Sequence, residues 1–272
     1  MAGLLLIRCG LAGQSEDRLR ILICNDDGIE APGIAALFEA VSQIAQVTVA
    51  APPQNCSGAG HSMNFERPIS VGEFEAKGSK WYVIDSPPAT CVRLALQSLL
   101  HEKPDLVISG INKGENTGIV TFYSATVACT REAAFAGIPS IAFSLESSQK
   151  MEYGDAAVFA ASLISELRAR GFPKDYYLNV NYPALPLEKV KGVRIVRQDT
   201  RQALDYYEKR TNPLGSIYFY PLYDLLDAGK EETDIWALKN GFVSVTPMSV
   251  DQSIQPPMAG LEFLRKLTWN SR

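Results

Sequence analysis

The chain has 272 residues, of which 46% are hydrophobic, and this length and composition suit a large domain with a sizeable core. No apolar run approaches the roughly 20 residues needed to cross a bilayer, so we expect a soluble protein without a membrane partner. The formal net charge is −4 at pH 7 and the basic residues form no run, which argues against a stable nucleic-acid partner but leaves individual nucleotides open as ligands.

The cysteines favour a reducing compartment. The chain has five, Cys9, Cys24, Cys56, Cys91 and Cys129, and none forms a C-x-x-C pair. Several lie in apolar or helical surroundings, where reduced cysteine acts as a small hydrophobe. This usage argues against a zinc site and predicts a cytoplasmic protein.

The first two thirds of the chain alternate short apolar runs with helical periodicity, which is typical of crossover helices on a parallel sheet. Strands are predicted at Arg20–Cys24, Gln46–Ala51 and Trp81–Ile84, and in PDLVISG up to Gly110, PSIAFSL and YYLNVNYP. Helices are predicted from Pro32, after SPPATC, at about Thr126–Ala136, and after a cap at Asp155. The expected class is therefore α/β.

The pattern changes from about Val193. β-like stretches follow (VRIVRQ, SIYFYPLY and FVSVTPM), and Pro256-Pro257 precedes a final short helix. We interpret this region as a mostly β appendage that serves as an oligomer interface. Residues 1–18 come before the first strand and are expected to be a disordered extension.

Three polar segments directly follow predicted strands: Asn25–Gly28, Asn55–His61 and Ile111–Ser124. In an open parallel sheet, ligands bind outside the carboxyl ends of the strands, so these segments are expected at one edge. Asp26 and Asp27 are adjacent there, and two buried carboxylates repel each other unless a cation lies between them.

The converging loops offer only oxygen ligands to such a cation. The candidates are Asp26, Asp27, Ser57, Asn112 and Asn116. Hard oxygen ligands select Mg²⁺, Mn²⁺ or Ca²⁺ rather than zinc, and water would complete the coordination. The aspartates are thus explained if they share a divalent ion.

The same loops also favour an anion. Glycines such as Gly58 let backbone N–H groups approach a ligand, and a helix that opens after Ser124 and Thr126 presents free N–H groups and a positive dipole end. A metal beside an anion cradle suggests a phosphate ester and metal-assisted hydrolysis. Ordinary roles compete, because D-D-G is common in turns and Ser and Thr are common helix caps. The convergence of three loops favours the functional interpretation.

Five longer motifs resemble those of a known family. NDDGIEAPG, APPQNCSGAGHSM, PDLVISGINKGENTG, YSATVACTREAAFAGIPSIAFS and NGFVSVTPMSVD are similar, in order and spacing, to the stationary-phase survival protein SurE family of metal-dependent nucleotidases. The resemblance covers about residues 20–255. It implies a Rossmann-like three-layer sandwich with a mostly parallel sheet, in which residues 19–190 form the catalytic core and residues 191–272 a β-hairpin arm for oligomerisation with a tail helix.

The resemblance also implies an activity. The family hydrolyses nucleoside 5'- and 3'-monophosphates to nucleoside and phosphate, some members shorten polyphosphate, and its members are homodimers or homotetramers whose β arm is exchanged between subunits. One Mg²⁺ or Mn²⁺ per subunit is expected on Asp26, Asp27, Ser57 and Asn112. Of these, Asp26, Asp27 and Asn112 are assigned as catalytic.

By the same resemblance, the phosphate is expected at a set of residues around the metal. These are Asn25, Ser57, Gly58, Asn116, Ser124 and Thr126.

The chain departs from the family pattern at three positions. Ala125 replaces the glycine of Y-S-G-T, Ser86–Cys91 reads SPPATC without the aspartate of G-T-P-x-D-C, and Ala133 replaces the glycine after Glu132. If position 125 needs a positive φ, alanine costs about 1 kcal/mol. None of the departures removes an expected metal ligand.

The main hypothesis is attack by a metal-activated water on the phosphate. The residues leave two alternatives open, in which an aspartate acts as general base or as nucleophile. One further alternative is an exopolyphosphatase or oligonucleotide end-trimming hydrolase that uses the same site. Another is a non-catalytic nucleotide or metal sensor, which Ala125 and the missing aspartate favour.

Overall fold

The structure is a computed structural model that describes residues 18–201, 204–224, 227–253 and 260–266. The expected extension, except for Arg18, therefore lies outside the described residues, as does Pro256-Pro257. Of the expected tail helix, the structure describes a 3₁₀ segment at Glu262–Lys266.

A nine-stranded sheet forms the centre of the molecule, with the strand order β3-β4-β2-β1-β5-β6-β7-β11-β8. The strands are β1 (Arg20–Cys24), β2 (Gln46–Ala51), β3 (Val71–Ala76), β4 (Ser79–Ile84), β5 (Leu106–Lys113), β6 (Ser140–Leu145), β7 (Tyr177–Tyr182), β8 (Val193–Ile195) and β11 (Val243–Met248). The six strands from β4 to β7 in this order pair in parallel, whereas β3 and β11 pair antiparallel with their neighbours β4 and β7. The predicted α/β class and mostly parallel sheet are confirmed.

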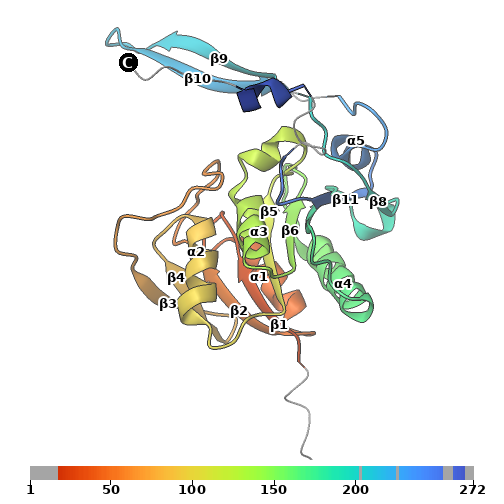
Figure 1. Ribbon diagram of the computed structural model, residues 1–272. Coiled ribbons are helices and arrows are strands. Elements are labelled where there is room, and N and C mark those ends of the chain that lie inside the picture. Colours follow the sequence, from red (N-terminus) through yellow and green to blue (C-terminus); the bar gives the residue numbers. More distant parts are fainter. Residues whose placement is uncertain (1–17, 202–203, 225–226, 254–259, 267–272) are drawn as a thin grey trace, which may run out of the picture.

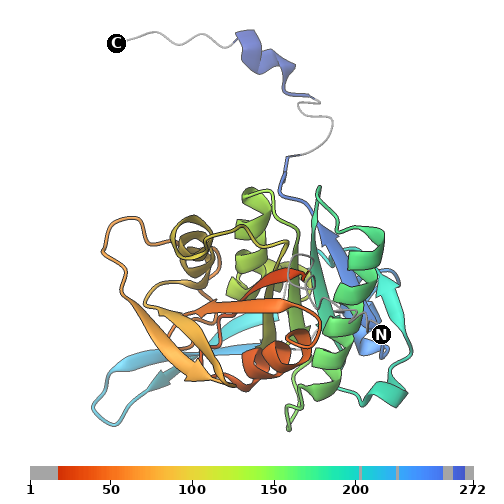
Figure 2. The same ribbon diagram turned by 90° about the horizontal axis from the view of Figure 1, so that it is seen from below.

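Helices cover both faces of this sheet. They are α1 (Pro32–Val41), α2 (Pro88–Leu94), α3 (Ala125–Phe135) and α4 (Gly154–Arg170), and a π-helical segment, Ala95–Leu99, continues α2. Figure 2 shows α1 and α4 on one face and α2 and α3 on the other. This arrangement confirms the predicted three-layer sandwich.

Strand β1 is buried on both sides, as its continuous apolar sequence predicts. Ile21 and Ile23 belong to the core under α1 and α4. Leu22 and Cys24 belong to the core under α2 and α3, where the free thiols Cys91 and Cys129 are also buried. β1 is therefore a central strand that is covered on both faces, and the polar residues after it begin at the middle of the sheet.

The strand order reverses at β1. The chain proceeds from β1 through β2 to β4 on one side, and then returns to add β5, β6 and β7 on the other side. In doubly wound sheets the crevice outside the carboxyl ends at such a switch point is where ligands bind. Asn25–Gly28 and the end of β5 meet at this switch point.

The C-terminal region has two parts. Strands β11 and β8 extend the main sheet beyond β7. In contrast, β9 (Leu204–Thr211) and β10 (Ile217–Asp224) form a separate antiparallel hairpin, which lies apart from the sheet (Figure 1).

Several predicted boundaries and elements differ from the observed ones. β3, β9 and a short helix α5 (Asp234–Lys239) were not predicted. The prediction that Asp155 caps α4 is wrong, because Tyr153 is the N-cap and the Asp155 carboxylate in the first turn accepts the Leu187 N–H at 2.9 Å. β5 runs past Gly110 to Lys113 through an irregularity between Ser109 and Asn112.

Within the described residues, no helix is both long enough and apolar enough to span a membrane.

Candidate active site

The three predicted loops meet at the carboxyl edge of the sheet. The Cys56 N–H donates to the Asp26 carbonyl at 2.7 Å, and the Lys113 N–H donates to Asp27 Oδ2 at 3.0 Å. The Gly60 N–H donates to the Tyr123 carbonyl at 2.9 Å. The predicted convergence of these loops is therefore confirmed.

Two glycines allow close packing around the end of β5. A Cβ at Gly33, in the first turn of α1, would lie 2.0 Å from the Ile111 carbonyl oxygen. A Cβ at Gly110, where φ is +123°, would lie 2.2 Å from the Phe143 carbonyl oxygen. Larger residues at either position would displace the backbone that carries Asn112.

Asp26 is buried and contacts the N-terminus of α3. Its Oδ1 accepts a hydrogen bond from the Thr126 hydroxyl, and Thr126 is itself fully buried. The pKa of Asp26 is raised to about 6, mainly by burial; the hydrogen bond from Thr126 acts in the opposite direction, and the neighbouring charge of Asp27 contributes to the rise. The positive end of the helix dipole favours the charged carboxylate at this position.

Asp27 lies next to it and is partly exposed. Burial raises the pKa of Asp27, whereas the hydrogen bond from the Lys113 N–H acts in the opposite direction. Asp27 is therefore the carboxylate of the pair that reaches solvent, with its orientation fixed by the end of β5.

Asn112 and Asn116 are buried but are held differently. The Asn112 side-chain amide donates to the Gly114 carbonyl at 2.8 Å, and no described residue donates to its Oδ1. The Asn116 side-chain amide donates to Ser144 Oγ at 2.9 Å, and the Asn116 backbone carbonyl accepts from Asn179 Nδ2 at 2.7 Å. Asn112 thus keeps an oxygen for a ligand, while the contacts of Asn116 are with β6 and β7 rather than with the aspartates.

The loop after β2 places Ser57 and Gly58 at the surface. The Ser57 N–H donates to Asn55 Oδ1 at 2.6 Å, and Gly58 has a φ of +77°. Both residues are exposed, and the preceding Cys56 is tied to Asp26. Ser57 therefore follows directly on the residue whose backbone N–H contacts Asp26.

Ser124 caps α3, since its Oγ accepts the Val127 N–H at 3.1 Å. Ala125 is the first residue of the helix and is fully buried. Among the described residues only Lys77 and Glu232 combine a side chain with a positive φ, so Ala125 adopts its conformation without backbone strain. The conditional cost predicted for alanine at this position does not arise.

The donor set fits a divalent cation. Asn25 donates to the Gly28 carbonyl at 2.7 Å, but its buried Oδ1 has no hydrogen-bond partner among the described residues. The pKa values of both adjacent carboxylates are raised, and a nearby positive charge would favour their charged forms. The described residues contain no group of three or more His, Cys, Asp and Glu side chains suited to a metal, so amide and hydroxyl oxygens would complete the set.

An ion-pair cluster around the buried Glu132 of α3 was not predicted. Glu132 accepts from Arg93 Nε at 2.5 Å, and its other oxygen lies 2.9 Å from His61 Nε2. His61 also stacks on Phe135, with the ring centroids 5.5 Å apart. This cluster fastens the loop that carries Ser57 and Gly58 to α2 and α3. The sequence offered only a histidine in a loop and a glutamate in a helix.

Asp234 was missed as well. This buried carboxylate at the start of α5 accepts three backbone N–H groups, from Gly118 at 2.8 Å, Asp199 at 2.9 Å and Ile235 at 2.9 Å. It therefore fixes the loop between Asn116 and Ser124 to the C-terminal segment. No short sequence motif connects residues so far apart in the chain.

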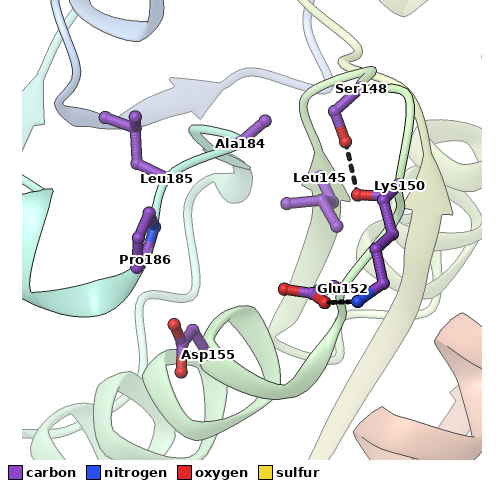
Figure 3. A pocket seen from close by; sticks show the side chains of 8 residues that line it. All are labelled: Leu145, Ser148, Lys150, Glu152, Asp155, Ala184, Leu185 and Pro186. Atoms are coloured by element: carbon purple, nitrogen blue, oxygen red, sulfur yellow. Dashed lines mark hydrogen bonds and ion pairs between the residues drawn. The ribbon is translucent and has the colours of Figure 1, made fainter.

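One hollow beside α4 does not suit a nucleotide. Figure 3 shows the side chains that line it, among them Leu145 at the end of β6 and Ala184 shortly after β7. Its volume is about 110 Å³. Lys150 Nζ is paired with Glu152, and Ser148 Oγ donates to the Lys150 carbonyl at 2.7 Å. This volume holds only a few water molecules, and its cation is already engaged.

Comparison with known proteins agrees with the motifs. A family model described as survival protein SurE matches residues 21–205, more than half of the chain. The fold is similar to the crystal structure of SurE protein from Aquifex aeolicus, with a TM-score of 0.81 and 37% sequence identity over 90% of this chain and 99% of that chain.

Proposed function

The chain belongs to the SurE family, which supports a phosphatase or nucleotidase type of reaction, and on this premise we propose that it hydrolyses nucleoside 5'- and 3'-monophosphates to nucleoside and phosphate. The observation that carries the proposal is the position of Asp26 and Asp27. They follow β1 at the switch point of the sheet, where Asp26 accepts from Thr126 in the first turn of α3 and Asp27 accepts from the N–H of Lys113, the residue after Asn112. Such a place suits an anion together with a cation.

A divalent cation, Mg²⁺ or Mn²⁺, would be held by Asp26, Asp27, Asn112 and Ser57. When bound, it supplies positive charge to the phosphate and lowers the pKa of a water molecule.

The protein's own groups contribute positioning and electrostatics. The Thr126 hydroxyl fixes Asp26, and the Lys113 N–H fixes Asp27. The N-terminus of α3, capped by Ser124, favours the negative charge that develops on the phosphate.

 The Thr126 hydroxyl donates to Asp26, so we propose Thr126 as a positioning residue that acts through this carboxylate.

The test is phosphate release from a panel of nucleoside 5'- and 3'-monophosphates and short polyphosphate, in EDTA, Mg²⁺ or Mn²⁺. We expect release that depends on the metal and is lost in Asp27→Asn, because this change removes one negative ligand without changing the size of the side chain. Glu75→Gln, an exposed carboxylate on β3, serves as the matched control. Release that persists in EDTA or in Asp27→Asn would overturn the metal mechanism.

The same assay separates the remaining alternatives. Polyphosphate as the preferred substrate would indicate an exopolyphosphatase, and tight nucleotide binding without release would indicate a sensor. Labelled phosphate trapped on Asp26 or Asp27 would indicate a nucleophilic aspartate rather than attack by water.

We also propose that the protein is a homodimer or homotetramer assembled through the β9–β10 hairpin. One face of this hairpin carries Tyr207, Ile217 and Phe219, which are 70%, 58% and 58% exposed. A two-stranded hairpin with apolar side chains in water is marginally stable by itself, and a second subunit would cover it.

A further inference from the structure

A polar cleft lies directly beside the aspartate site, at the carboxyl ends of β2 and β4. Its volume is about 280 Å³, and it is lined by the loop after β2 and by the turn between β4 and α2. Cys56 belongs to its lining, and the Cys56 N–H donates to the Asp26 carbonyl at 2.7 Å. The cleft therefore borders the residue that carries one of the two carboxylates.

The walls of the cleft combine flat apolar surfaces with a buried polar group. Pro52, Pro53, Pro68 and Pro87 line it. Ser86 also lines it, and the buried Ser86 hydroxyl has no hydrogen-bond partner among the described residues. An unpaired buried hydroxyl is costly, which favours a ligand that can bond to it.

The lining also includes Asn64, which is partly buried, and three exposed polar residues, Gln54, Arg67 and Asp85. In the part of the chain that the structure describes, the side chains of the three exposed residues make no hydrogen bond or ion pair. They provide an amide, a guanidinium and a carboxylate, which are the groups that bind the edges of nucleobases and the hydroxyls of ribose.

We propose that this cleft binds the nucleoside part of the substrate, with the base against the proline rings and the polar edge of the nucleoside at Gln54, Arg67 and Asp85. The inference rests on the proposed function for the position of the phosphate. The hollow beside α4 is too small for this role and has its lysine already paired.

The test compares nucleoside monophosphates with p-nitrophenyl phosphate, which has a phosphate but no ribose or base. For Asp85→Ala and Arg67→Ala we expect the ratio of kcat/KM between the two substrate types to fall by about tenfold, the effect of one charge-assisted hydrogen bond. Glu75→Ala, another exposed carboxylate outside the cleft, should keep the ratio of the wild type. An equal loss on both substrates, or an unchanged ratio, would overturn the proposal.

A second measurement separates this inference from the proposed reaction. Isothermal titration with adenosine, guanosine, cytidine and uridine reports binding without any phosphate chemistry. Binding by the wild type that weakens about tenfold in Asp85→Ala would support the cleft even if no phosphate ester were hydrolysed. A wild-type protein that binds none of the four nucleosides would overturn it, whatever the phosphate assay gives.

Discussion

Ala125 begins α3 at a place where the family pattern has glycine. Its φ is not positive and its methyl group is buried, so glycine would relieve no strain there. We expect Ala125→Gly to lower the free energy of unfolding by about 0.5–1 kcal/mol, because glycine loses more backbone entropy in a helix than alanine. Urea unfolding measures this, and a glycine variant more stable than the wild type would contradict it.

The ionisation of Glu132 should make the stability of the fold depend on pH. Burial would raise the pKa of Glu132, but hydrogen bonds from His61 and Arg93 outweigh burial and hold the pKa below its ordinary value of 4.5. A carboxylate whose pKa is lower in the folded state stabilises the fold above its unfolded pKa, and this stabilisation is lost as the pH falls through the folded pKa.

We therefore expect Glu132→Gln to lower the free energy of unfolding by about 1–2 kcal/mol at neutral pH. The difference from the wild type should shrink once the pH falls below about 4.5, as urea unfolding at several pH values would show. Glu73→Gln, whose ion pair with Lys80 is at the surface, should change stability by only a few tenths of a kcal/mol. A difference that stays constant with pH would refute the assigned role of the charge.

The β9–β10 hairpin has an exposed apolar face that can be tested as a subunit interface. Tyr207 and Phe219 lie on one face of β9 and β10, and both are exposed. If this face forms the subunit interface, the double variant Tyr207→Asp with Phe219→Asp should give a monomer by light scattering, because charges are costly to bury. Val158→Asp changes another exposed apolar residue, on α4, and should leave the mass unchanged.

Strands buried on both faces were predictable from sequence, whereas edge elements were not. The apolar runs of β1, β5 and β6 are typical of strands in a parallel sheet that is covered on both faces. β3 reads VGEFEA and is largely exposed, so its pattern does not differ from that of a polar loop. β11 was recognised as a strand, but its place beside β7 depends on pairing between distant segments.

The candidate site was predictable to a similar extent. Asp26, Asp27 and Asn112 follow strands, and the rule for parallel sheets brings such residues to one edge. The supports of the site could not be predicted in the same way. Glu132 meets His61 across 71 residues, and Asp234 meets Gly118 across 116 residues. Contacts of this kind leave no local pattern in the sequence.

At the scale of the whole molecule, the site joins segments from the first strand, the loop after β2, the end of β5 and the start of α3. A cation that binds this arrangement binds the folded chain, since the unfolded chain does not bring these segments together. Metal binding should therefore stabilise the entire fold rather than one loop.

The expected size follows from linkage. At a free metal concentration of about 100 times Kd, the folded state gains about 2.7 kcal/mol. For a chain of this size that corresponds to a rise in Tm of about 5–10 °C. Calorimetry with Mg²⁺ or Mn²⁺ should show this rise in the wild type, EDTA should reverse it, and Asp27→Asn should abolish it. Glu75→Gln, which keeps every proposed ligand, should show the full rise. An equal rise in Asp27→Asn would place the cation elsewhere, because that variant has lost the carboxylate whose orientation the end of β5 fixes.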